Sequence, residues 1–292
     1  MPLVHEQSFR VRFHDSDMHK MVRDASYLRY MQEAAFAASA AAGYPEERYQ
    51  IIRRLWLIRE TLLEIRSPLR YGDSVRIKTW VASFGKVRSR RAYELRLDGA
   101  DEPIAVAHTD WVLIDLDTEW PAVIPDEMIA GFSPEGAVRD TSSRQRFPVT
   151  PPAPENAWRQ QQVVQWRDLD SVGHVNNAVY ADYIQDAAHR ELTARGWPAA
   201  RMAQTGIDVA TQTLRIEYLR PALPGNELVI TTWSADVSPA GALRYTTVTC
   251  GDDLLAQAHT RWGCVDAVTR EPVAFPDALR GDLEATGSGE DE

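Results

Sequence analysis

The stretch DLDSVGHVNNAVYADYIQD, at residues 168–186, has a counterpart in DSDMHKMVRDASYLRYMQE, at residues 15–33. An offset of 153 residues (168 − 15) aligns two aspartates, two tyrosines and a glutamine followed by an acidic residue. The same offset then matches glycines, prolines, glutamates and tryptophans downstream, as in Trp80 with Trp233. Chance similarity does not keep one register over such a length, so the chain contains two copies of one unit.

Each copy shows the same order of expected elements. A short β-rich run, at residues 9–14 or 163–167, is followed by a helix on which apolar residues recur at helical spacing. Gly43 and Gly196, each with a proline two residues later, are expected where these helices end. Turn residues then separate four strand-like runs per copy, at 55–66, 74–83, 87–97 and 104–116, and at 208–219, 227–235, 243–250 and 254–265. This order predicts an α+β fold, with a helix packed closely against a curved antiparallel sheet in each copy.

Length and composition fit two globular domains, since the chain has 292 residues, of which 44% are hydrophobic and 25% charged. The repeat places the first unit at residues 1–132 and the second at residues 161–280. Between them, residues 133–160 are rich in proline and polar residues and are predicted to form a linker. Residues 281–292 are predicted to form a disordered acidic tail.

Composition and absent motifs argue against several classes of function. A net charge of −10 disfavours nucleic acid and anionic membranes as partners. Two cysteines without C-x-x-C spacing indicate neither a disulfide framework nor a zinc site. No signal peptide or membrane-spanning run is recognisable, so we expect a soluble cytoplasmic protein. The sequence lacks G-x-S-x-G, Walker A and G-x-G-x-x-G motifs, which disfavours serine hydrolases, nucleotide hydrolysis and hydride transfer, and no cofactor is expected.

The densest group of polar residues lies where the first strand of the second copy leads into the helix. Gly173 permits a tight turn, and Asn176 and Asn177 are suited to cap a helix whose first N–H groups are unpaired. A thioester carbonyl bound there would meet donors directed at the oxyanion that forms on attack. Asp170 could activate a water or attack directly, and His174 could orient that water or donate to the developing charge.

Each of these residues also has an ordinary structural explanation. Asp and Asn before a helix are most often caps, and a single His near a turn usually has no special role. Their occurrence together within residues 168–180 favours a functional site over capping alone.

The pattern D-x-D-x-x-G-H-V-N-N-x-x-Y over residues 168–180 resembles the signature of the hotdog-fold thioesterases, in the group of 4-hydroxybenzoyl-CoA and long-chain acyl-CoA thioesterases. Two such units in one chain resemble the acyl-ACP thioesterases. The resemblance implies a double hotdog, in which two tandem units, each with a long helix wrapped by a curved antiparallel sheet, form an intrachain pseudo-dimer with the active site at their interface. It also implies that Asp170 is the catalytic carboxylate and that the helix start near Asn177 polarises the carbonyl.

The expected activity is hydrolysis of acyl-CoA or acyl-ACP to a free acid and a thiol, as in fatty acid metabolism. The expected site residues are Asp170, His174 and Asn177 for catalysis, and Gly173, Asn176 and Tyr180 for substrate binding. One alternative is an acyl-thioester-binding protein without catalysis. A hotdog hydratase or dehydratase is a weaker alternative, because the Asp-x-Asn-Pro-x-His pattern that is typical of such enzymes is not found in this sequence.

The sequence departs from the plant acyl-ACP thioesterases in two places. Those enzymes carry an Asn where this chain has Val172, and a Glu-Cys pair where it has Pro221 and Ala222. Cys250 and Cys264 lie elsewhere, so a cysteine mechanism is not supported. The choice between CoA and acyl carrier protein therefore stays open, as does the length of the acyl chain.

The first copy keeps the carboxylate at Asp17 but loses the rest of the pattern. Lys20, Met21, Arg23 and Asp24 stand where the second copy has its Gly, its His and its two Asn residues. We expect a degenerate site here, retained to complete the interface and to line the acyl pocket, with Asp17 among the substrate-binding residues.

The first copy also suggests an alternative, a metal site formed by His14, Asp15, Asp17 and His19. Potential ligands clustered at the end of one strand are weak evidence without a distant fourth partner. We therefore expect no metal.

A strongly basic hairpin distinguishes the first copy from the second. It contains Lys86, Arg88 and Arg90, whereas its counterpart at residues 238–244 is nearly neutral. In an acidic protein these charges could hold the phosphates of CoA or the acidic face of a carrier protein, although a solvated strand face also explains them. Association into a homodimer stays open, because the edge strands are not visibly blunted.

Overall fold

The structure, a computed structural model, describes residues 1–139, 146–269 and 271–284. It divides into two units, residues 1–147 and residues 148–292. The division falls within the segment at 133–160 that was predicted as a linker.

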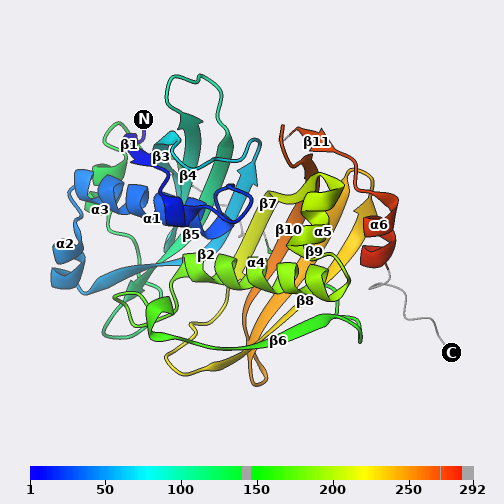
Figure 1. The fold of residues 1–292 in the computed structure, drawn as a ribbon. Helices are drawn as coiled ribbons and strands as arrows, with labels where there is room; N and C mark the ends of the chain where they lie inside the picture. The colour runs from blue at the N-terminus through cyan, green and yellow to red at the C-terminus, as the bar shows by residue number, and fades with distance from the viewer. Residues whose placement is uncertain (140–145, 270, 285–292) are drawn as a thin grey trace. The chain divides into compact units, whose positions relative to one another are not determined.

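The first unit contains one long helix and a five-stranded antiparallel sheet with the strand order β1-β3-β4-β5-β2 (Figure 1). Its elements in chain order are β1 (His5–Arg10), α1 (Asp24–Ala41), α2 (Glu46–Ile51), β2 (Arg54–Ile65), β3 (Ser74–Phe84), β4 (Arg88–Leu97), β5 (Ala105–Asp115) and α3 (Asp126–Phe132). A 3-10 turn at Phe13–Asp15 lies between β1 and α1.

The second unit repeats this arrangement, with the strand order β7-β10-β9-β8-β6 and the long helix α4 lying along one face of the sheet (Figure 1). Its elements are β6 (Trp158–Val163), α4 (Asn177–Ala194), α5 (Ala199–Thr205), β7 (Ile207–Tyr218), β8 (Glu227–Ser238), β9 (Gly241–Cys250), β10 (Asp253–Asp266), β11 (Pro272–Val273) and α6 (Asp277–Glu284). The 3-10 turn lies at Trp166–Asp168. The predicted α+β fold class and the eight predicted strands of the two meanders are confirmed.

Small residues and bulges explain how a helix fits against each sheet. Ala34 and Ala35 in α1, and Ala187 and Ala188 in α4, are buried, so their short side chains let the helix approach the sheet closely. A β-bulge interrupts the pairing of β2 with β5 between Ile58 and Glu60. A second bulge interrupts the pairing of β7 with β10 between Arg261 and Trp262, and the 153-residue offset relates its position in β7 to that of the first bulge in β2. Bulges increase twist and bend a strand, which helps each sheet to curve around its helix.

The first strand of each unit lies earlier than predicted. We expected strands at residues 9–14 and 163–167, whereas β1 ends at Arg10 and β6 ends at Val163. The reason is a turn held by a buried carboxylate, because Asp15 accepts the backbone N–H of Arg12, and Asp168 that of Gln165, each at 2.8 Å. These bonds pull the chain out of the sheet and into a 3-10 turn before the long helix begins.

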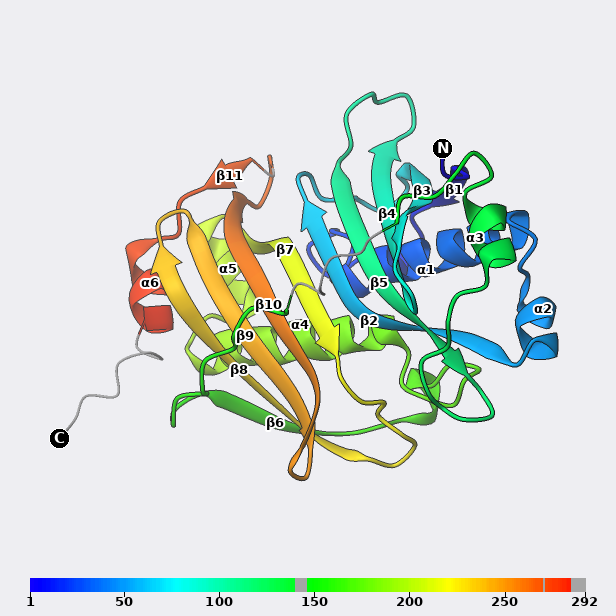
Figure 2. The same cartoon turned by 180° about the vertical axis from the view of Figure 1, so that it is seen from behind.

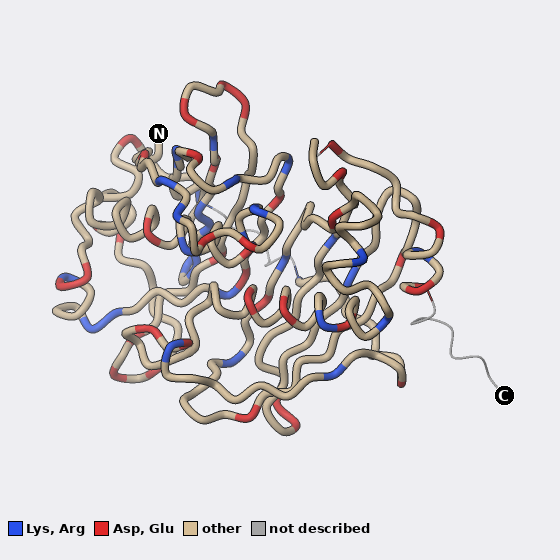
Figure 3. The backbone as a smooth tube through the Cα atoms, in the orientation of Figure 1, with Lys and Arg blue, Asp and Glu red and all other residues tan. Residues whose placement is uncertain are grey.

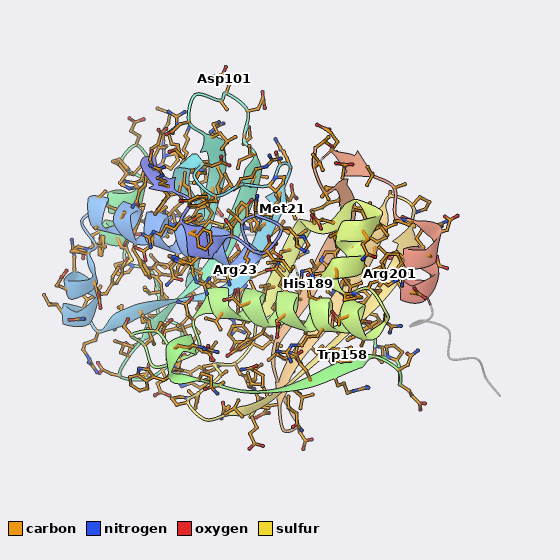
Figure 4. The ribbon with its side chains drawn as sticks, in the orientation of Figure 1. Met21, Arg23, Asp101, Trp158, His189 and Arg201 are labelled. Atoms are coloured by element: carbon orange, nitrogen blue, oxygen red, sulfur yellow. The ribbon has the colours of Figure 1, made fainter. Side chains whose placement is uncertain are left out.

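The predicted boundaries also differ from the observed elements at two ends. Strand β6 begins at Trp158, labelled in Figure 4, inside the segment predicted as linker. Helix α6 includes residues 281–284, which were predicted to belong to the tail, because Leu279 and Leu283 are buried against the second unit. Residues 285–292 of the predicted tail lie outside the described residues.

The segment after the division runs over the sheet face opposite α4 in the second unit (Figure 2). Thr150 donates to the side-chain oxygen of Gln257 at 2.7 Å, and its hydroxyl lies 2.8 Å from Nε2 of His259. Burial lowers the pKa of His259 to about 4, and the nearby charge of Arg215 adds to the effect. His259 is therefore neutral at physiological pH.

This histidine predicts an acid-sensitive stability. The unfolded chain protonates near pH 6.5 and the folded chain near pH 4, so the unfolded state binds more protons within that window and stability falls as the pH falls. Because the side chain is only half buried, we expect a loss of about 1–2 kcal/mol, measured by urea unfolding at pH 7.0 and pH 4.5. His259→Asn should flatten the slope, and an unchanged slope in that variant would contradict the assignment.

Charged residues of both signs are scattered along both units (Figure 3). Acidic residues gather in the loop between β4 and β5, where Asp98, Asp101 and Glu102 lie. Among the described residues, no helix is both long and apolar enough to cross a membrane.

Candidate functional site

The turn that precedes α4 is a short hairpin. Leu169 and Val175 pair as an antiparallel bridge, and the amide of Asp170 donates to the carbonyl of His174 at 3.0 Å. The amide of Gly173 donates to the carbonyl of Asp170 at 3.0 Å, with φ of +83° at the glycine. This left-handed backbone conformation, which residues with a side chain rarely adopt, explains why a glycine occupies position 173. The space beside it is open, since nothing lies within 4 Å of a Cβ placed there.

The carboxylate of Asp170 is oriented by two donors. Its Oδ1 accepts the backbone N–H of Val172 at 3.0 Å, and its Oδ2 accepts the side-chain amide of Asn176 at 3.3 Å. The residue is half-buried. Each carboxylate oxygen has two acceptor positions, so these two bonds orient the group and leave it able to accept a further proton or hydrogen bond.

Asn176 connects this carboxylate to the start of α4. As the N-cap, its Oδ1 accepts the N–H of Ala178 at 3.0 Å, while its carbonyl accepts the N–H of Val179 at 2.9 Å. Of the first three helical amides, only that of Asn177 is left without an acceptor among the described residues. The donors available to a ligand at this helix start are thus fewer than the row of amides expected from the sequence, and consist of one N–H at the positive end of the helix dipole.

Tyr218 was not among the site residues predicted from the sequence, and its hydroxyl donates to the carbonyl of Asn177 at 3.1 Å. Its ring packs edge-on against Tyr180, with the ring centroids 5.4 Å apart. The 153-residue offset places Ile65 at this position in the first unit. Comparing the two copies residue by residue for polar side chains that occur in only one of them would have identified it.

Tyr180 is 3% exposed, and its hydroxyl accepts the backbone N–H of Ala222 at 3.2 Å. Tyr27 makes the same contact with Leu69 in the first unit, at 2.8 Å. Burial raises the pKa of Tyr180 to about 12, so it stays a neutral phenol. The structure thus gives Tyr180 a supporting contact that both copies share, whereas His174 lies half-buried on the returning arm of the hairpin.

The equivalent turn of the first unit has the same backbone without the glycine. The amide of Asp17 donates to the carbonyl of Met21 at 2.8 Å, and the amide of Lys20 donates to that of Asp17 at 3.1 Å, with φ of +64° at Lys20. Oδ1 of Asp17 accepts the amides of His19 at 2.9 Å and Met21 at 3.0 Å.

The link from this carboxylate to the helix is missing. Arg23 occupies the N-cap position of α1 and donates to the carbonyl of His14 instead, and no side chain caps the helix (Figure 4 labels Met21 and Arg23). The first unit therefore has an acidic turn of the same shape without the amide that couples Asp170 to α4.

The basic hairpin between β3 and β4 carries fewer available charges than its sequence suggests. Arg90 forms a bidentate ion pair with Asp110, with both N–O distances 2.7 Å, and Arg91 is buried. Lys86 and Arg88 remain exposed. Of the three cations expected in the hairpin, two, Lys86 and Arg88, are thus without such an ion pair.

The alternative metal site gains no support from the described part of the chain. His14 and Asp15 approach to 3.6 Å, but Asp15 is buried and accepts the hydroxyl of Tyr30 at 2.6 Å. Within the described residues, no three His, Cys, Asp or Glu side chains are grouped so that they could hold a metal ion.

Two buried aspartates support the two turns. Asp168 accepts the hydroxyl of Tyr183 at 2.7 Å, as Asp15 does for Tyr30. Burial and this hydrogen bond raise the pKa of Tyr183, so the phenol stays protonated and donates. We expect Asp168→Ala and Asp15→Ala each to lower the free energy of unfolding by about 2–4 kcal/mol, because each leaves a buried hydroxyl unpaired and removes a turn contact.

Chemical denaturation measures both losses. Only Asp168→Ala should also lower thioester hydrolysis, because only that turn holds the link from Asp170 to Asn176. Equal activity losses in the two variants would argue against a site in the second unit alone.

The sequence matches two families. The family described as the acyl-ACP thioesterase N-terminal domain matches residues 2–132, and the thioesterase-like superfamily matches residues 164–283. The chain is 24% identical over 199 residues to the chloroplast acyl-[acyl-carrier-protein] hydrolase FATB2 of Cuphea viscosissima. That alignment covers 65% of this chain and 48% of the relative, so the chain spans about half the length of the curated relative that it matches.

Solved structures with the same fold cover nearly the whole chain. The 12:0-ACP thioesterase from Umbellularia californica superimposes with a TM-score of 0.71 at 18% identity, covering 92% of this chain and 94% of that one. An acyl-ACP thioesterase from Bacteroides thetaiotaomicron superimposes with a TM-score of 0.68 at 16% identity, covering 89% of this chain and 97% of that one. These similarities confirm the predicted double hotdog fold.

Proposed function

Because the chain belongs to the acyl-ACP thioesterase family, we propose that it hydrolyses acyl thioesters of a carrier protein to a free acid and the carrier thiol. The observation that carries this proposal is the connection from the Asp170 carboxylate through Asn176 to the start of α4. It places a proton acceptor beside a helix N-terminus that has an unpaired amide, which is the combination that attack on a thioester carbonyl requires.

In the proposed reaction the carbonyl oxygen accepts the N–H of Asn177. Asp170 removes a proton from water as the water oxygen attacks the carbonyl carbon, and the negative charge develops on the oxygen at the helix start. Collapse of the tetrahedral intermediate breaks the C–S bond, and the thiolate leaves and takes up a proton. In the second route, Asp170 attacks the carbonyl carbon itself, the C–S bond breaks and the thiolate leaves and takes up a proton, and water then hydrolyses the mixed anhydride to the free acid and the Asp170 carboxylate.

The neighbouring residues have distinct proposed roles. The open space at Gly173 lets substrate approach the backbone of the turn. Tyr218 holds the carbonyl of Asn177 and so stabilises the first residue of α4. His174 orients the water or donates to the developing charge, and the hydroxyl of Tyr180 joins α4 to the backbone of Ala222.

The test is release of free thiol from decanoyl, dodecanoyl and hexadecanoyl thioesters of acyl carrier protein and of CoA. Faster release from the carrier protein supports the proposal, and release from CoA alone would reassign the carrier. Binding without release from either carrier would support the acyl-thioester-binding alternative. Hydration of crotonyl-CoA would instead indicate a hydratase.

The exposed charges of the hairpin predict a carrier-specific effect. We expect the double variant Lys86→Ala/Arg88→Ala to raise KM for acyl-ACP about threefold to tenfold, because rim charges attract an acidic partner without taking part in the chemistry. The KM for an uncharged acyl-pantetheine should stay the same. Arg96→Ala, which removes a cation paired with Glu94 on the same strand, is the control, and an equal effect there would argue against a docking role.

A further inference from the structure

Among the residues that the structure describes, one arginine of each unit is buried, and the two lie at the same position of the repeat. In the second unit, Arg244 of β9 is 1% exposed, and its guanidinium donates to the carboxylate of Glu191 on α4. It also donates to Ser234 at 2.7 Å and to Thr232 at 3.0 Å. The buried cation thus has a carboxylate as counter-ion and two hydroxyls as acceptors, as a buried charge requires.

The counterpart in the first unit, Arg91 of β4, lacks this set of partners. Arg91 is 6% exposed, and its one hydrogen bond goes from Nη1 to the hydroxyl of Thr79, at a long 3.4 Å. Its guanidinium carbon lies 5.6 Å from the ring centroid of Phe132. No carboxylate pairs with Arg91 anywhere in the described part of the chain.

The repeat explains which partner is missing. The offset of 153 that relates Arg91 to Arg244, and Thr79 to Thr232, also relates Ala38 to Glu191. Ala38 is a buried residue of α1, so the helix face that supplies a carboxylate in the second unit supplies a methyl group in the first. Burial lowers the pKa of Arg91 and of Arg244, but only for Arg244 does a carboxylate, that of Glu191, act against the effect of burial.

The groups near Arg91 do not replace the carboxylate. Tyr49 and Tyr93 act on it electrostatically, but burial raises the pKa of each, so both are neutral phenols. The hydroxyl of Tyr49 is already bonded to Ser39 at 2.9 Å, and that of Tyr93 to Thr109 at 3.0 Å. A buried guanidinium without an anion costs several kcal/mol, a cost that an external anion would remove.

We propose that the first unit binds a carboxylate group of an apolar ligand, with Arg91 as its counter-ion in place of the internal glutamate of the second unit. The surroundings favour an apolar ligand, because the neighbouring core of this unit is aromatic and aliphatic, with Tyr44, Phe84, Leu113, Met128 and Phe132. The carboxylate comes from a free fatty acid or from the far end of a dicarboxylic acyl chain. A free fatty acid would make the site independent of the hydrolysis proposed for Asp170, whereas a dicarboxylic acyl chain makes it rest on that proposed function.

Binding of decanoate to the full-length protein tests the site by calorimetry and thermal unfolding, with decanol as the uncharged control. At a concentration about 100-fold above Kd, we expect decanoate to raise Tm by roughly 5 °C and decanol to have a much smaller effect. Equal effects of the acid and the alcohol would overturn the proposal.

The matched variant is Ala38→Glu, which supplies the carboxylate found in the second unit. We expect it to raise Tm by about 5 °C without ligand and to weaken decanoate binding at least about tenfold, because the added side chain takes the ligand's place. A lower Tm, or unchanged decanoate binding, would contradict the proposal. Arg91→Met should also weaken decanoate binding at least about tenfold and leave decanol binding unchanged.

Two ligands distinguish the sources of the carboxylate. Decanoate presents its single carboxylate, whereas decanedioic acid monoamide carries an uncharged group at the other end and mimics the far end of a dicarboxylic acyl chain. If the monoamide binds more tightly than decanoate, and if Ala38→Glu abolishes that binding, the site is assigned to dicarboxylic chains. Tighter binding of decanoate assigns it to free fatty acids, and binding of neither ligand overturns the proposal.

Discussion

Replacing Asp170 by Asn is expected to lower kcat for thioester hydrolysis at least about 10³-fold, with little change in Tm. An amide oxygen can still accept the N–H of Val172, so the turn keeps its main hydrogen bond. What is lost is the group that, in the proposed reaction, accepts the proton of the attacking water or attacks the carbonyl itself. Single-turnover release of thiol, measured together with Kd for a non-hydrolysable thioether analogue, separates a loss of chemistry from a loss of binding.

Two comparison variants make this result specific. Ser171→Ala changes an exposed side chain of the same turn and should keep kcat within about twofold of the parent, because surface substitutions of this kind rarely alter the fold. Asp17→Asn changes the equivalent carboxylate of the first unit. A loss in Asp17→Asn as large as that in Asp170→Asn would show that both turns are catalytic, against the reading of the first as degenerate.

Replacing Glu191 by Ala is expected to lower the free energy of unfolding by about 3–5 kcal/mol, because it leaves the buried cation of Arg244 without a counter-charge. Glu191 also accepts from Arg195 at 2.9 Å, but Arg195 is partly exposed and can be solvated. The large cost therefore comes from Arg244. Urea unfolding of the parent and the variant measures the difference.

The double variant Glu191→Leu/Arg244→Met is the control. Removing both charges and keeping apolar volume should recover most of the stability lost in Glu191→Ala, since a buried ion pair contributes little beyond an apolar pair of the same size. A loss below about 1 kcal/mol in the single variant would show that Arg244 finds another acceptor. The same result would weaken the argument that Arg91 needs an external anion.

The two copies have diverged in opposite ways at two places. At the turn, the second unit has the Asn176 link and Tyr218, whereas the first has Arg23 and Ile65. At the buried arginine, the second unit supplies the carboxylate of Glu191, whereas the first has Ala38 at that position. The unit with the candidate catalytic turn thus supplies a carboxylate to its buried arginine, while the buried arginine of the other unit is the one proposed to bind an external carboxylate.

Local patterns were sufficient to predict most of the secondary structure. The 153-residue register identified the duplication, helical spacing identified α1 and α4, and alternation bounded by turn residues identified the strands of both meanders, because these features depend on neighbours in sequence. The first strands were misplaced by about five residues, because the turn that ends each one depends on a carboxylate whose second partner, a tyrosine hydroxyl, lies 15 residues further on. Short helices such as α3 and α5 were missed because one or two turns carry too little periodicity.

The sequence by itself determined the duplication, the α+β class and the acidic turn at Asp170, since a repeat, a period and a capping pattern can all be read along the chain. Only the tertiary structure decided which charges have partners. Arg244 meets a carboxylate 53 residues away, Tyr218 reaches a carbonyl 41 residues away, and Arg90 is neutralised by a residue on the neighbouring strand. Ion pairs and hydrogen bonds depend on distance in space, and packing of helix against sheet sets that distance.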